Sequence, residues 1–256
     1  MIELRELHKR FGRYHVLRGL TLTIPKNKIT VIIGPSGSGK SVTLKHIIGL
    51  LQPDRGNVLV DGVAVGTLNS WELAKFRRNF GMVFQHAALF DSMTVFENVA
   101  FPLHEAGGYT DVQIRTRVTE RLAAVGLSGI DEKMPADLSG GMRKRVGVAR
   151  ALALQPSIVL YDEPTTGLDP LMTDAIDKLI VAMQHERPVT SVVISHDIQS
   201  TFRIADFIAM LHGGCIIETG TPQTFRQSSN PIVRRFLEGR SDARPGEAPI
   251  DETIMM

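Results

Sequence analysis

The segment GPSGSGKS, from Gly34 to Ser41, has the residue types and spacing of a loop that binds phosphate groups. Glycines are needed there because backbone N–H groups must come within hydrogen-bonding distance of phosphate oxygens, which a Cβ atom would obstruct. In this pattern Lys40 reaches the β- and γ-phosphates of a nucleotide, and the Ser41 hydroxyl reaches Mg²⁺. A strand-like apolar run precedes the segment and the helix-like VTLKHIIGLL follows it. We therefore predict a nucleoside triphosphate site that uses magnesium.

Two carboxylates and a histidine stand at the ends of further apolar runs. SIVLYDE ends in Asp162 and Glu163, and TSVVISH ends in His196. Open α/β sheets bind ligands at the carboxyl ends of their strands, so these side chains are expected near the phosphates. Asp162 suits Mg²⁺, directly or through a water molecule, while Glu163 is placed to accept a proton from an attacking water. We expect His196 to face the γ-phosphate.

The strands that position these residues are predicted to form a mostly parallel sheet. Lys28–Gly34, Ser157–Glu163 and Thr190–His196 are continuous runs rich in β-branched residues, which is typical of parallel strands buried on both faces. Residues 2–24 instead alternate between apolar and polar positions and end at the turn PKNK, which indicates antiparallel strands. These patterns predict an α/β fold with a mainly parallel core sheet and an N-terminal antiparallel β subdomain.

A helical segment is predicted to interrupt this sheet. Its clearest helix is TDVQIRTRVTERLAAVGL, with Thr110 or Asp111 as the N-cap and an end near Gly126. We expect a helical subdomain, over about residues 87–155, inserted in the core.

The C-terminal part contains two short elements and a tail. FIAMLHGGCIIETG predicts a hairpin that turns at Gly213-Gly214, and a short helix is expected over Pro231–Glu238. Residues 240–256, RSDARPGEAPIDETIMM, are polar and contain proline and glycine, so we expect a loosely ordered tail. The preceding residues, 1–239, are predicted to form one domain.

The composition limits the possible classes of protein. With 256 residues, of which 43% are apolar, the chain can bury a substantial core. Its net charge of +2 gives no strong field for nucleic acid, which we do not expect as a partner. The start MIELRELHKRF lacks the apolar stretch of a signal peptide, and the single Cys215 cannot form an internal disulfide. A soluble, cytoplasmic chain is expected.

Six motifs in a fixed order resemble the nucleotide-binding subunit of an ABC transporter. They are the phosphate loop, FQ (Phe84-Gln85), LSGG (Leu138–Gly141), YDEP (Tyr161–Pro164), TGLD (Thr166–Asp169) and SH (Ser195-His196). The resemblance covers residues 1 to about 225. It implies a P-loop NTPase fold and an ATP hydrolase that uses ATP and Mg²⁺.

The resemblance also implies a role for each motif. Gln85 would link the nucleotide to the membrane partner and share in catalysis and in Mg²⁺ binding with Ser41 and Asp162, while His196 would steady the γ-phosphate beside Glu163. Phe11 matches the aromatic residue that stacks on adenine, with Tyr14 as its neighbouring rival. The nucleotide-binding residues would be Phe11, Gly34, Pro35, Ser36, Gly37, Ser38, Gly39, Lys40, Ser41, Thr43, Ser139, Gly140, Gly141 and Asp169.

The LSGG motif explains why one chain carries two phosphate-binding segments. In this family Ser139 and the backbone of Gly140-Gly141 contact the γ-phosphate of ATP held by a second subunit, and Asp169 lies at the interface between the two chains. The resemblance therefore implies a head-to-tail dimer that closes around two ATP molecules. Because the chain holds one copy of each motif, it requires a second copy of itself.

One residue departs from the general pattern of the family. Met142 stands after LSGG, where glutamine is usual. This change and the stretches FQHAALFDSMTVFENVAFPL, LSGGMRKRVGVARALALQP and SHDIQSTFRIADFIAML resemble the ATPases of MCE-linked lipid transporters, the Mla group. The resemblance implies phospholipid transport with a membrane permease, an MCE-domain lipid-binding protein and, in many systems, a small STAS-domain protein. It places the chain peripherally on the cytoplasmic face of the inner membrane.

Other interpretations remain open at this point. An importer of amino acids or other small solutes shares every nucleotide motif, and glutamine at position 142 would favour it. A soluble ABC ATPase of translation or DNA repair would carry two cassettes or a long coiled coil, and a P-loop kinase would not need LSGG. Two further features are assigned ordinary roles: Arg143–Arg145 as a solvated helix face or a charge near phosphate, and Trp71 as a packing residue.

Overall fold

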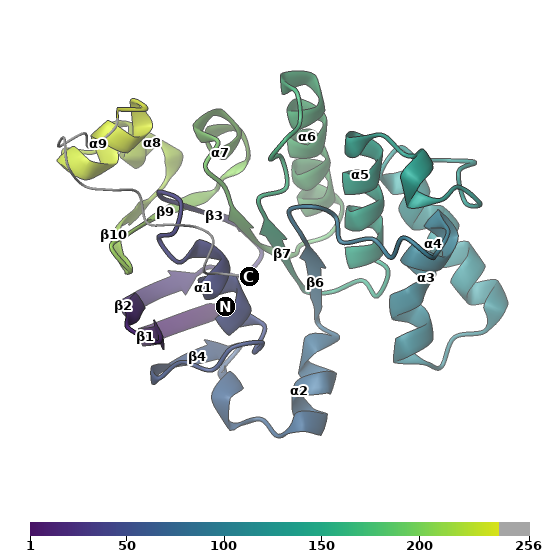
Figure 1. The fold of residues 1–256 in the computed structure, drawn as a ribbon, viewed down its shortest axis with the longest axis horizontal. Coiled ribbons are helices and arrows are strands. Elements are labelled where there is room, and N and C mark those ends of the chain that lie inside the picture. Colours follow the sequence, from purple (N-terminus) through teal and green to yellow (C-terminus); the bar gives the residue numbers. More distant parts are fainter. Residues whose placement is uncertain (241–256) are drawn as a thin grey trace.

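Two sheets form the framework of residues 1–240, the part of the chain that the computed structural model describes (Figure 1). The smaller sheet is antiparallel, in the order β2 (Tyr14–Ile24), β1 (Ile2–Phe11), β4 (Arg55–Val60) and β5 (Val63–Ala64). The larger sheet has the order β10 (Cys215–Gly220), β9 (Phe207–His212), β3 (Ile29–Ile33), β8 (Thr190–Ile194), β7 (Ile158–Asp162) and β6 (Phe80–Val83). Its strands pair in parallel, except that β10 forms an antiparallel hairpin with β9. The predicted α/β architecture is confirmed.

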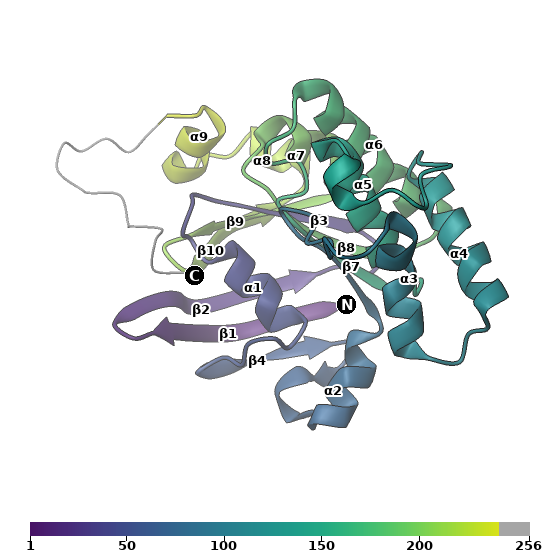
Figure 2. The same cartoon turned by 45° about the vertical axis from the view of Figure 1, so that its right-hand side comes forward.

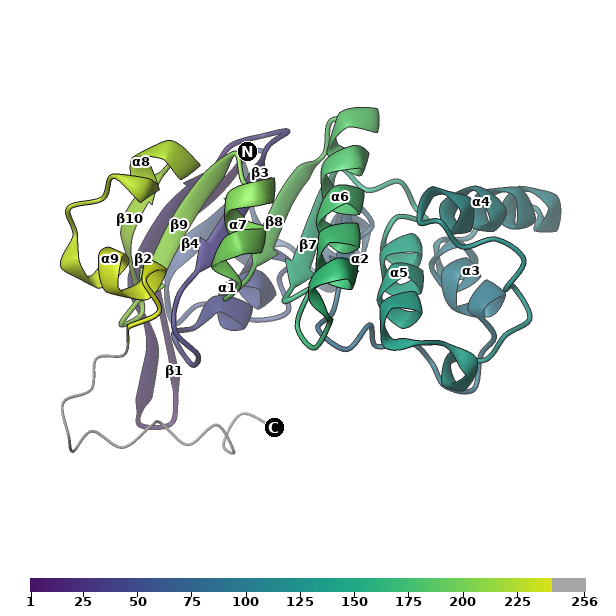
Figure 3. The same ribbon diagram turned by 90° about the horizontal axis from the view of Figure 1, so that it is seen from above.

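The helices lie around the larger sheet in separate groups. Helix α1 (Lys40–Ile47) lies between the two sheets (Figure 2), and α6 (Pro170–Glu186) and α7 (Ile198–Ile204) lie on the opposite face of the larger sheet. Figure 3 shows α3 (Val95–Ala106), α4 (Asp111–Ala124) and α5 (Gly140–Ala151) beyond β7, and α8 (Pro222–Arg226) and α9 (Pro231–Leu237) near β10. The remaining helical elements are α2 (Ser70–Arg77), η1 (Val65–Thr67) and η2 (Pro135–Asp137). Apart from Arg240, the tail predicted over residues 240–256 lies outside the described residues.

The segment between β6 and β7 is mainly helical, as its periodicity predicts. Helix α4 has Thr110 as its N-cap, and the Thr110 hydroxyl accepts a hydrogen bond from the Gln113 backbone N–H at 3.3 Å. The Gln113 side chain accepts one from the Thr110 backbone N–H in return, which completes a capping box. A cap of this kind stabilises a helix by about 1 kcal/mol.

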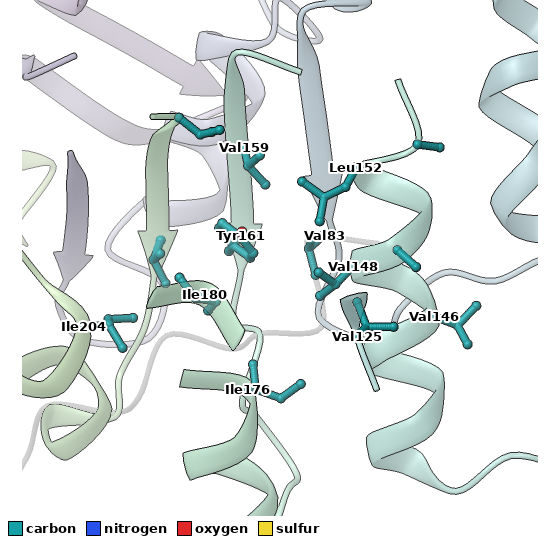
Figure 4. Packing of buried hydrophobic residues seen from close by; sticks show 14 of the residues in the cluster. Val83, Val125, Val146, Val148, Leu152, Val159, Tyr161, Ile176, Ile180 and Ile204 are labelled. Atoms are coloured by element: carbon teal, nitrogen blue, oxygen red, sulfur yellow. The ribbon is translucent and has the colours of Figure 1, made fainter. Parts of the chain in front are cut away.

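Strand β7 shows why the core strands are apolar at successive positions. Val159 and Tyr161 point into the cluster formed with α5 and α6 (Figure 4), while Ile158 and Leu160 pack in the cluster around α1. None of these four residues is more than 4% exposed. Because both faces are buried, the strand is fixed in register and presents its last residue, Asp162, at the edge of the sheet.

Trp71 does not pack as the sequence analysis expects. It lies in the first turn of α2 and is 73% exposed. This short helix buries none of its residues fully; Leu73 and Phe76 only pack partly against the neighbouring core. The ring of Trp71 instead lies under the ammonium of Lys75, 5.6 Å from the ring centroid. The expectation was wrong because the helix meets the core with its other side.

Within the described residues, no helix combines the length and the apolar character that crossing a membrane requires.

Candidate functional site

The glycine-rich loop joins the end of β3 to the start of α1. Gly34, at φ +154°, lies so close to the β9 backbone that an added Cβ atom would come within 2.1 Å of the Leu211 carbonyl oxygen. Gly37 and Gly39 also have positive φ angles, of 72° and 105°. No side chain caps the N-terminus of α1, so its first N–H groups are available to an anion.

Two polar side chains of this loop support a phosphate-binding role. Lys40 is only 8% exposed, and its ammonium donates hydrogen bonds to the carbonyl oxygens of Gly34 (2.8 Å) and Pro35 (3.1 Å). Burial lowers the pKa of Lys40, and the negative charges of Glu163 and Asp162 raise it. The Ser38 hydroxyl oxygen is buried without a hydrogen-bond partner. A ligand oxygen is the group that such an orphaned donor fits.

Not every predicted residue of the loop faces outward. Pro35, Ser36 and Gly37 are exposed at the rim. Thr43 is fully buried, and its hydroxyl donates to the Gly39 carbonyl oxygen at 2.9 Å within α1. The structure therefore shows Thr43 in a contact that stabilises the start of the helix.

The structure brings Ser41 and Asp162 together from distant parts of the sequence. The Ser41 hydroxyl donates to Asp162 Oδ1 at 3.0 Å. Burial raises the pKa of Asp162, and the hydrogen bond from Ser41 opposes this effect. A hydroxyl and a carboxylate oxygen are hard ligands of the type that Mg²⁺ takes together with phosphate oxygens and water. No group of three or more His, Cys, Asp or Glu side chains within residues 1–240 could hold a metal ion.

Gln85 makes no direct contact with the pair of Ser41 and Asp162 through a hydrogen bond. It follows β6 in the loop before α3 and is half-buried. Among the described residues, no hydrogen bond joins its side chain to Ser41 or Asp162. The structure thus places Gln85 at the same edge of the sheet without assembling it into the pair.

Glu163 and His196 form a second pair beside the first. His196 Nδ1 lies 2.8 Å from Glu163 Oε2, and the Thr166 hydroxyl donates to the same oxygen at 3.1 Å. With Glu163 ionised, the contact requires a proton on His196 Nδ1. The Glu163 side chain is 12% exposed and that of His196 is 59% exposed. The carboxylate is thus oriented by two donors and still faces solvent from one side.

Glu163 has an unusual backbone conformation. Its φ angle is +50°, in the left-handed region, which costs a non-glycine residue about 1–2 kcal/mol. Such strain persists only where the surrounding contacts hold the backbone in place, and it is frequent at catalytic positions.

The LSGG segment lies at the N-terminus of α5. The Ser139 hydroxyl caps this helix by accepting from the Met142 N–H at 3.2 Å, and Ser139 and Gly140 are exposed. Gly141 is buried against α6, since an added Cβ atom would lie 2.9 Å from Met172 Sδ. In Figure 1, α5 lies beyond β6, while α1 lies below the middle of the larger sheet. The two segments of one chain that the sequence predicts to bind phosphate therefore do not converge.

A pocket beside the glycine-rich loop could hold a nucleotide base. Its walls come from the turn between β1 and β2, the loop and the turn between β9 and β10; the lining includes Phe11, Tyr14, Val16, Pro35, His212 and Gly213. Phe11 and Tyr14 are 42% and 40% exposed. Both candidate aromatic residues thus border the pocket.

The comparisons with known proteins agree with this geometry. A family profile described as "ABC transporter" matches residues 17–166. The chain belongs to the ABC transporter ATP-binding family. It is the ATP-hydrolysing type of subunit that this family couples to transport, and its structural relatives have the same fold.

Three relatives illustrate the range of this family. "Probable ribonucleotide transport ATP-binding protein mkl" of Mycobacterium tuberculosis is 43% identical over 239 residues, which are 93% of this chain and 67% of that protein. "Intermembrane phospholipid transport system ATP-binding protein MlaF" of Haemophilus influenzae is 40% identical over 242 residues, which cover 94% and 92% of the two chains. The dimeric ATP-binding cassette MJ0796, bound to ADP and Pi, superposes with a TM-score of 0.80 and 34% identity, over 87% of this chain and 99% of that one.

The structure corrects one interpretation of the basic cluster, the solvated helix face, for Lys144; Arg143 is exposed as that interpretation expects, and a charge near phosphate stays a prediction. Lys144 is not on a solvated face: it is 8% exposed and donates to two main-chain carbonyl oxygens. Arg143 and Arg145 also donate to carbonyl oxygens, of Leu138 and of the loop after α4. The signal was present in the sequence, because Gly141, Lys144 and Val148 recur at helical spacing along a buried stripe.

The two aromatic residues that border the pocket beside the glycine-rich loop allow a direct prediction. Both rings have a cation nearby: Arg13 lies 5.3 Å from the Tyr14 centroid and Lys9 lies 5.8 Å from the Phe11 centroid. Arg13 also donates to the Tyr14 hydroxyl at 3.3 Å, whereas the Lys9 ammonium donates to Gln52 and Asp54 and makes no hydrogen bond to Phe11. We expect Phe11→Ala to weaken ATP binding by about 5- to 150-fold, the range for losing one base–aromatic stack of 1–3 kcal/mol. Tyr14→Ala should change it less than threefold. Equilibrium titration with ATP measures both, and the reverse order would assign the stacking to Tyr14.

Proposed function

We propose that this ABC ATPase works as a head-to-tail dimer around two ATP molecules. Ser139 and the N-terminal backbone of α5 in one chain would contact the γ-phosphate bound by the loop of the other. The observation that supports this proposal is the separation of α1 and α5 within one chain, although α1 has no side-chain cap and Ser139 and Gly140 at the start of α5 are exposed. Asp169, the N-cap of α6, and the 80% exposed Leu171 would lie at the interface.

Each residue around the glycine-rich loop would have a separate role in ATP hydrolysis. Lys40 would bind the β- and γ-phosphates, and Ser41, Asp162 and Gln85 would hold Mg²⁺. The ion, when bound, neutralises phosphate charge and orients the nucleotide. Glu163 would accept the proton of the attacking water, and His196 would steady the γ-phosphate from beside it. Loss of the γ-phosphate then removes the contacts that hold the dimer closed, which makes the dimer a two-state switch.

The head-to-tail arrangement is tested by mixing two inactive chains. In a mixed dimer of Ser139→Arg and Lys40→Ala, one site carries both lesions and the other carries neither. We expect hydrolysis in the mixture to exceed that of each pure mutant, approaching one quarter of wild type when chains exchange freely and sites act independently. Activity no higher than in the pure mutants would oppose the arrangement, and crosslinking Ser36→Cys to Gly140→Cys between chains would separate wrong geometry from obligatory coupling.

We infer that the cargo is phospholipid. The support comes from the MlaF relatives, which match over nearly their whole length, and from Met142 after LSGG. "Protein TRIGALACTOSYLDIACYLGLYCEROL 3" of Arabidopsis thaliana, 40% identical over 94% of this chain, is a further relative. The partners would be a membrane permease, an MCE-domain protein and a small STAS-domain protein, with the ATPase peripheral on the cytoplasmic face of the inner membrane.

A groove next to Gln85 is suitable for a permease. Its lining includes one charged residue, Arg150, and the apolar residues Phe80, Met82, Phe84, Ala88, Phe90, Phe101, Pro102 and Leu154. Phe84 and Phe90 are 39% and 42% exposed, so the groove presents apolar surface. Docking there would place the partner against the loop that carries Gln85, close to the nucleotide.

The cargo is tested on the assembled complex. We expect the purified ATPase–permease–MCE complex to contain phospholipid by mass spectrometry and to transfer labelled phospholipid in an ATP-dependent manner. The alternative is an importer of amino acids or other small solutes. Co-purification of a soluble solute-binding protein, with hydrolysis stimulated by an amino acid and indifferent to lipid, would establish that alternative and leave the ABC ATPase assignment intact.

A further inference from the structure

Lys144 is a buried cation outside the nucleotide motifs. Its ammonium donates hydrogen bonds to the carbonyl oxygens of Pro164, at 2.9 Å, and Thr166, at 2.5 Å. Burial lowers the pKa of Lys144, and the negative charge of Glu163 raises it. An unpaired ammonium in this position would be strongly destabilising, so the two carbonyls are the contacts that allow the charge to be buried.

Thr166 connects this cation to the Glu163 carboxylate. Its carbonyl accepts from Lys144, and its hydroxyl donates to Glu163 Oε2 at 3.1 Å. The Thr166 backbone N–H also donates to the Glu163 carbonyl oxygen at 3.3 Å. Residues 164–166 thus hold Glu163 from the C-terminal side, next to the residue whose own backbone has φ +50°.

We propose that Lys144 is a positioning residue for hydrolysis. Its ammonium fixes the backbone of residues 164–166. This backbone in turn holds the Glu163 carboxylate of the same chain at the position where it can accept a proton from the attacking water. The proposal rests on the proposed role of Glu163. Ser139 caps the same helix, α5. Lys144 therefore connects the LSGG segment, which would contact the nucleotide bound by the partner chain, to Glu163, which would act on the nucleotide bound by its own chain.

The first test replaces the ammonium without shortening the side chain greatly. Lys144→Met leaves both carbonyls without their donor, so we expect kcat to fall by about 10- to 100-fold, as small displacements of catalytic groups do. ATP affinity should stay within twofold of wild type. Lys144→Arg, which keeps donors for both carbonyls, should recover part of kcat. A kcat for Lys144→Met within twofold of wild type would overturn the proposal. A loss of ATP affinity as large as the loss of kcat would overturn it as well.

Arg145→Met is the matched control. Arg145 is the next residue of α5, and its guanidinium also lies near two carbonyl oxygens, of Val125 and Gly126, at 3.4 and 3.5 Å. These carbonyls belong to the loop after α4, away from Glu163. We expect this variant to keep kcat within twofold of wild type. A loss equal to that of Lys144→Met would show that any cation removed from α5 has the same effect and would contradict a specific role.

A double mutant tests whether Lys144 acts through Glu163. When Glu163→Gln has already removed the base, adding Lys144→Met should lower the residual hydrolysis by less than twofold, because residues that act as a unit are not additive. Single-turnover hydrolysis measures this residual rate. A further tenfold loss in the double mutant would mean that Lys144 acts elsewhere.

Mixed dimers identify the chain on which Lys144 acts. In a mixed dimer of Lys144→Met and Ser139→Arg, one site takes its loop and Glu163 from the Ser139→Arg chain and its Ser139 from the Lys144→Met chain, so this site should hydrolyse ATP. In a mixed dimer of Lys144→Met and Lys40→Ala, the one intact phosphate loop belongs to the Lys144→Met chain and depends on the Glu163 of that chain, so activity should stay low. The reverse order would overturn the proposal. The Ser139→Arg and Lys40→Ala mixture is the reference: if it shows no activity, the crosslinking test decides between wrong dimer geometry and obligatory coupling, while the kcat and double-mutant tests of Lys144 still hold.

Discussion

Replacing Glu163 with glutamine is expected to slow ATP hydrolysis by about 10²- to 10⁴-fold, the contribution of a general base, while ATP affinity is unchanged. Glutamine has nearly the same shape and can still accept from the Thr166 hydroxyl, whose contact with Glu163 Oε2 is 3.1 Å. It cannot take a proton from water. Because the γ-phosphate then stays in place, the closed dimer should accumulate with ATP.

Two measurements and one control test this expectation. Steady-state phosphate release gives the rate, and sedimentation with ATP gives the dimer fraction. Glu132→Gln, at an exposed position after α4, is the control and should hydrolyse ATP like wild type. Hydrolysis by Glu163→Gln within a factor of two of wild type would reject Glu163 as the base.

The sequence predicts the strands of both sheets well because burial of one or both faces of a strand determines the spacing of its apolar residues. Ile158 to Tyr161 are apolar without interruption because each face of β7 packs against a separate core cluster. Such a short, uninterrupted apolar run is typical of a strand that is buried on both faces. The alternation in residues 2–24 likewise follows from one buried face, and β1 and β2 pair from Ile2 opposite Ile24 to Phe11 opposite Tyr14. Local patterns of this kind need no knowledge of distant residues.

Contacts between distant segments are less predictable. The sequence places Ser41 and Asp162 at one edge of the sheet, but the 3.0 Å hydrogen bond between them depends on the packing of α1 below β7. The expectation of a solvated helix face was wrong for Lys144 for the same reason, since the carbonyl oxygens that accept its hydrogen bonds belong to a segment after β7. A side chain's charge is visible in the sequence, whereas its partner is fixed by tertiary structure.

Lys40→Ala is expected to weaken ATP binding by about 10- to 150-fold, because a hydrogen bond to a charged group contributes about 1.5–3 kcal/mol. The ammonium of Lys40 lies inside the loop against the Gly34 and Pro35 carbonyls, and its stem is fixed by burial, so it needs little reorganisation to reach phosphate. Nucleotide titration at constant ionic strength measures the loss.

Lys28→Ala is the control for Lys40→Ala. Lys28 lies at the opposite end of β3, where its half-exposed ammonium pairs with Asp206 at 3.2 Å. Both variants remove one positive charge from the same strand–loop–helix unit, so a general electrostatic effect would weaken ATP binding equally in both. A local phosphate contact affects Lys40→Ala alone. If the assembled transporter moves phospholipid as we propose, Lys40→Ala should also abolish its ATP-dependent transfer, because the γ-phosphate then lacks the ammonium that positions it for hydrolysis.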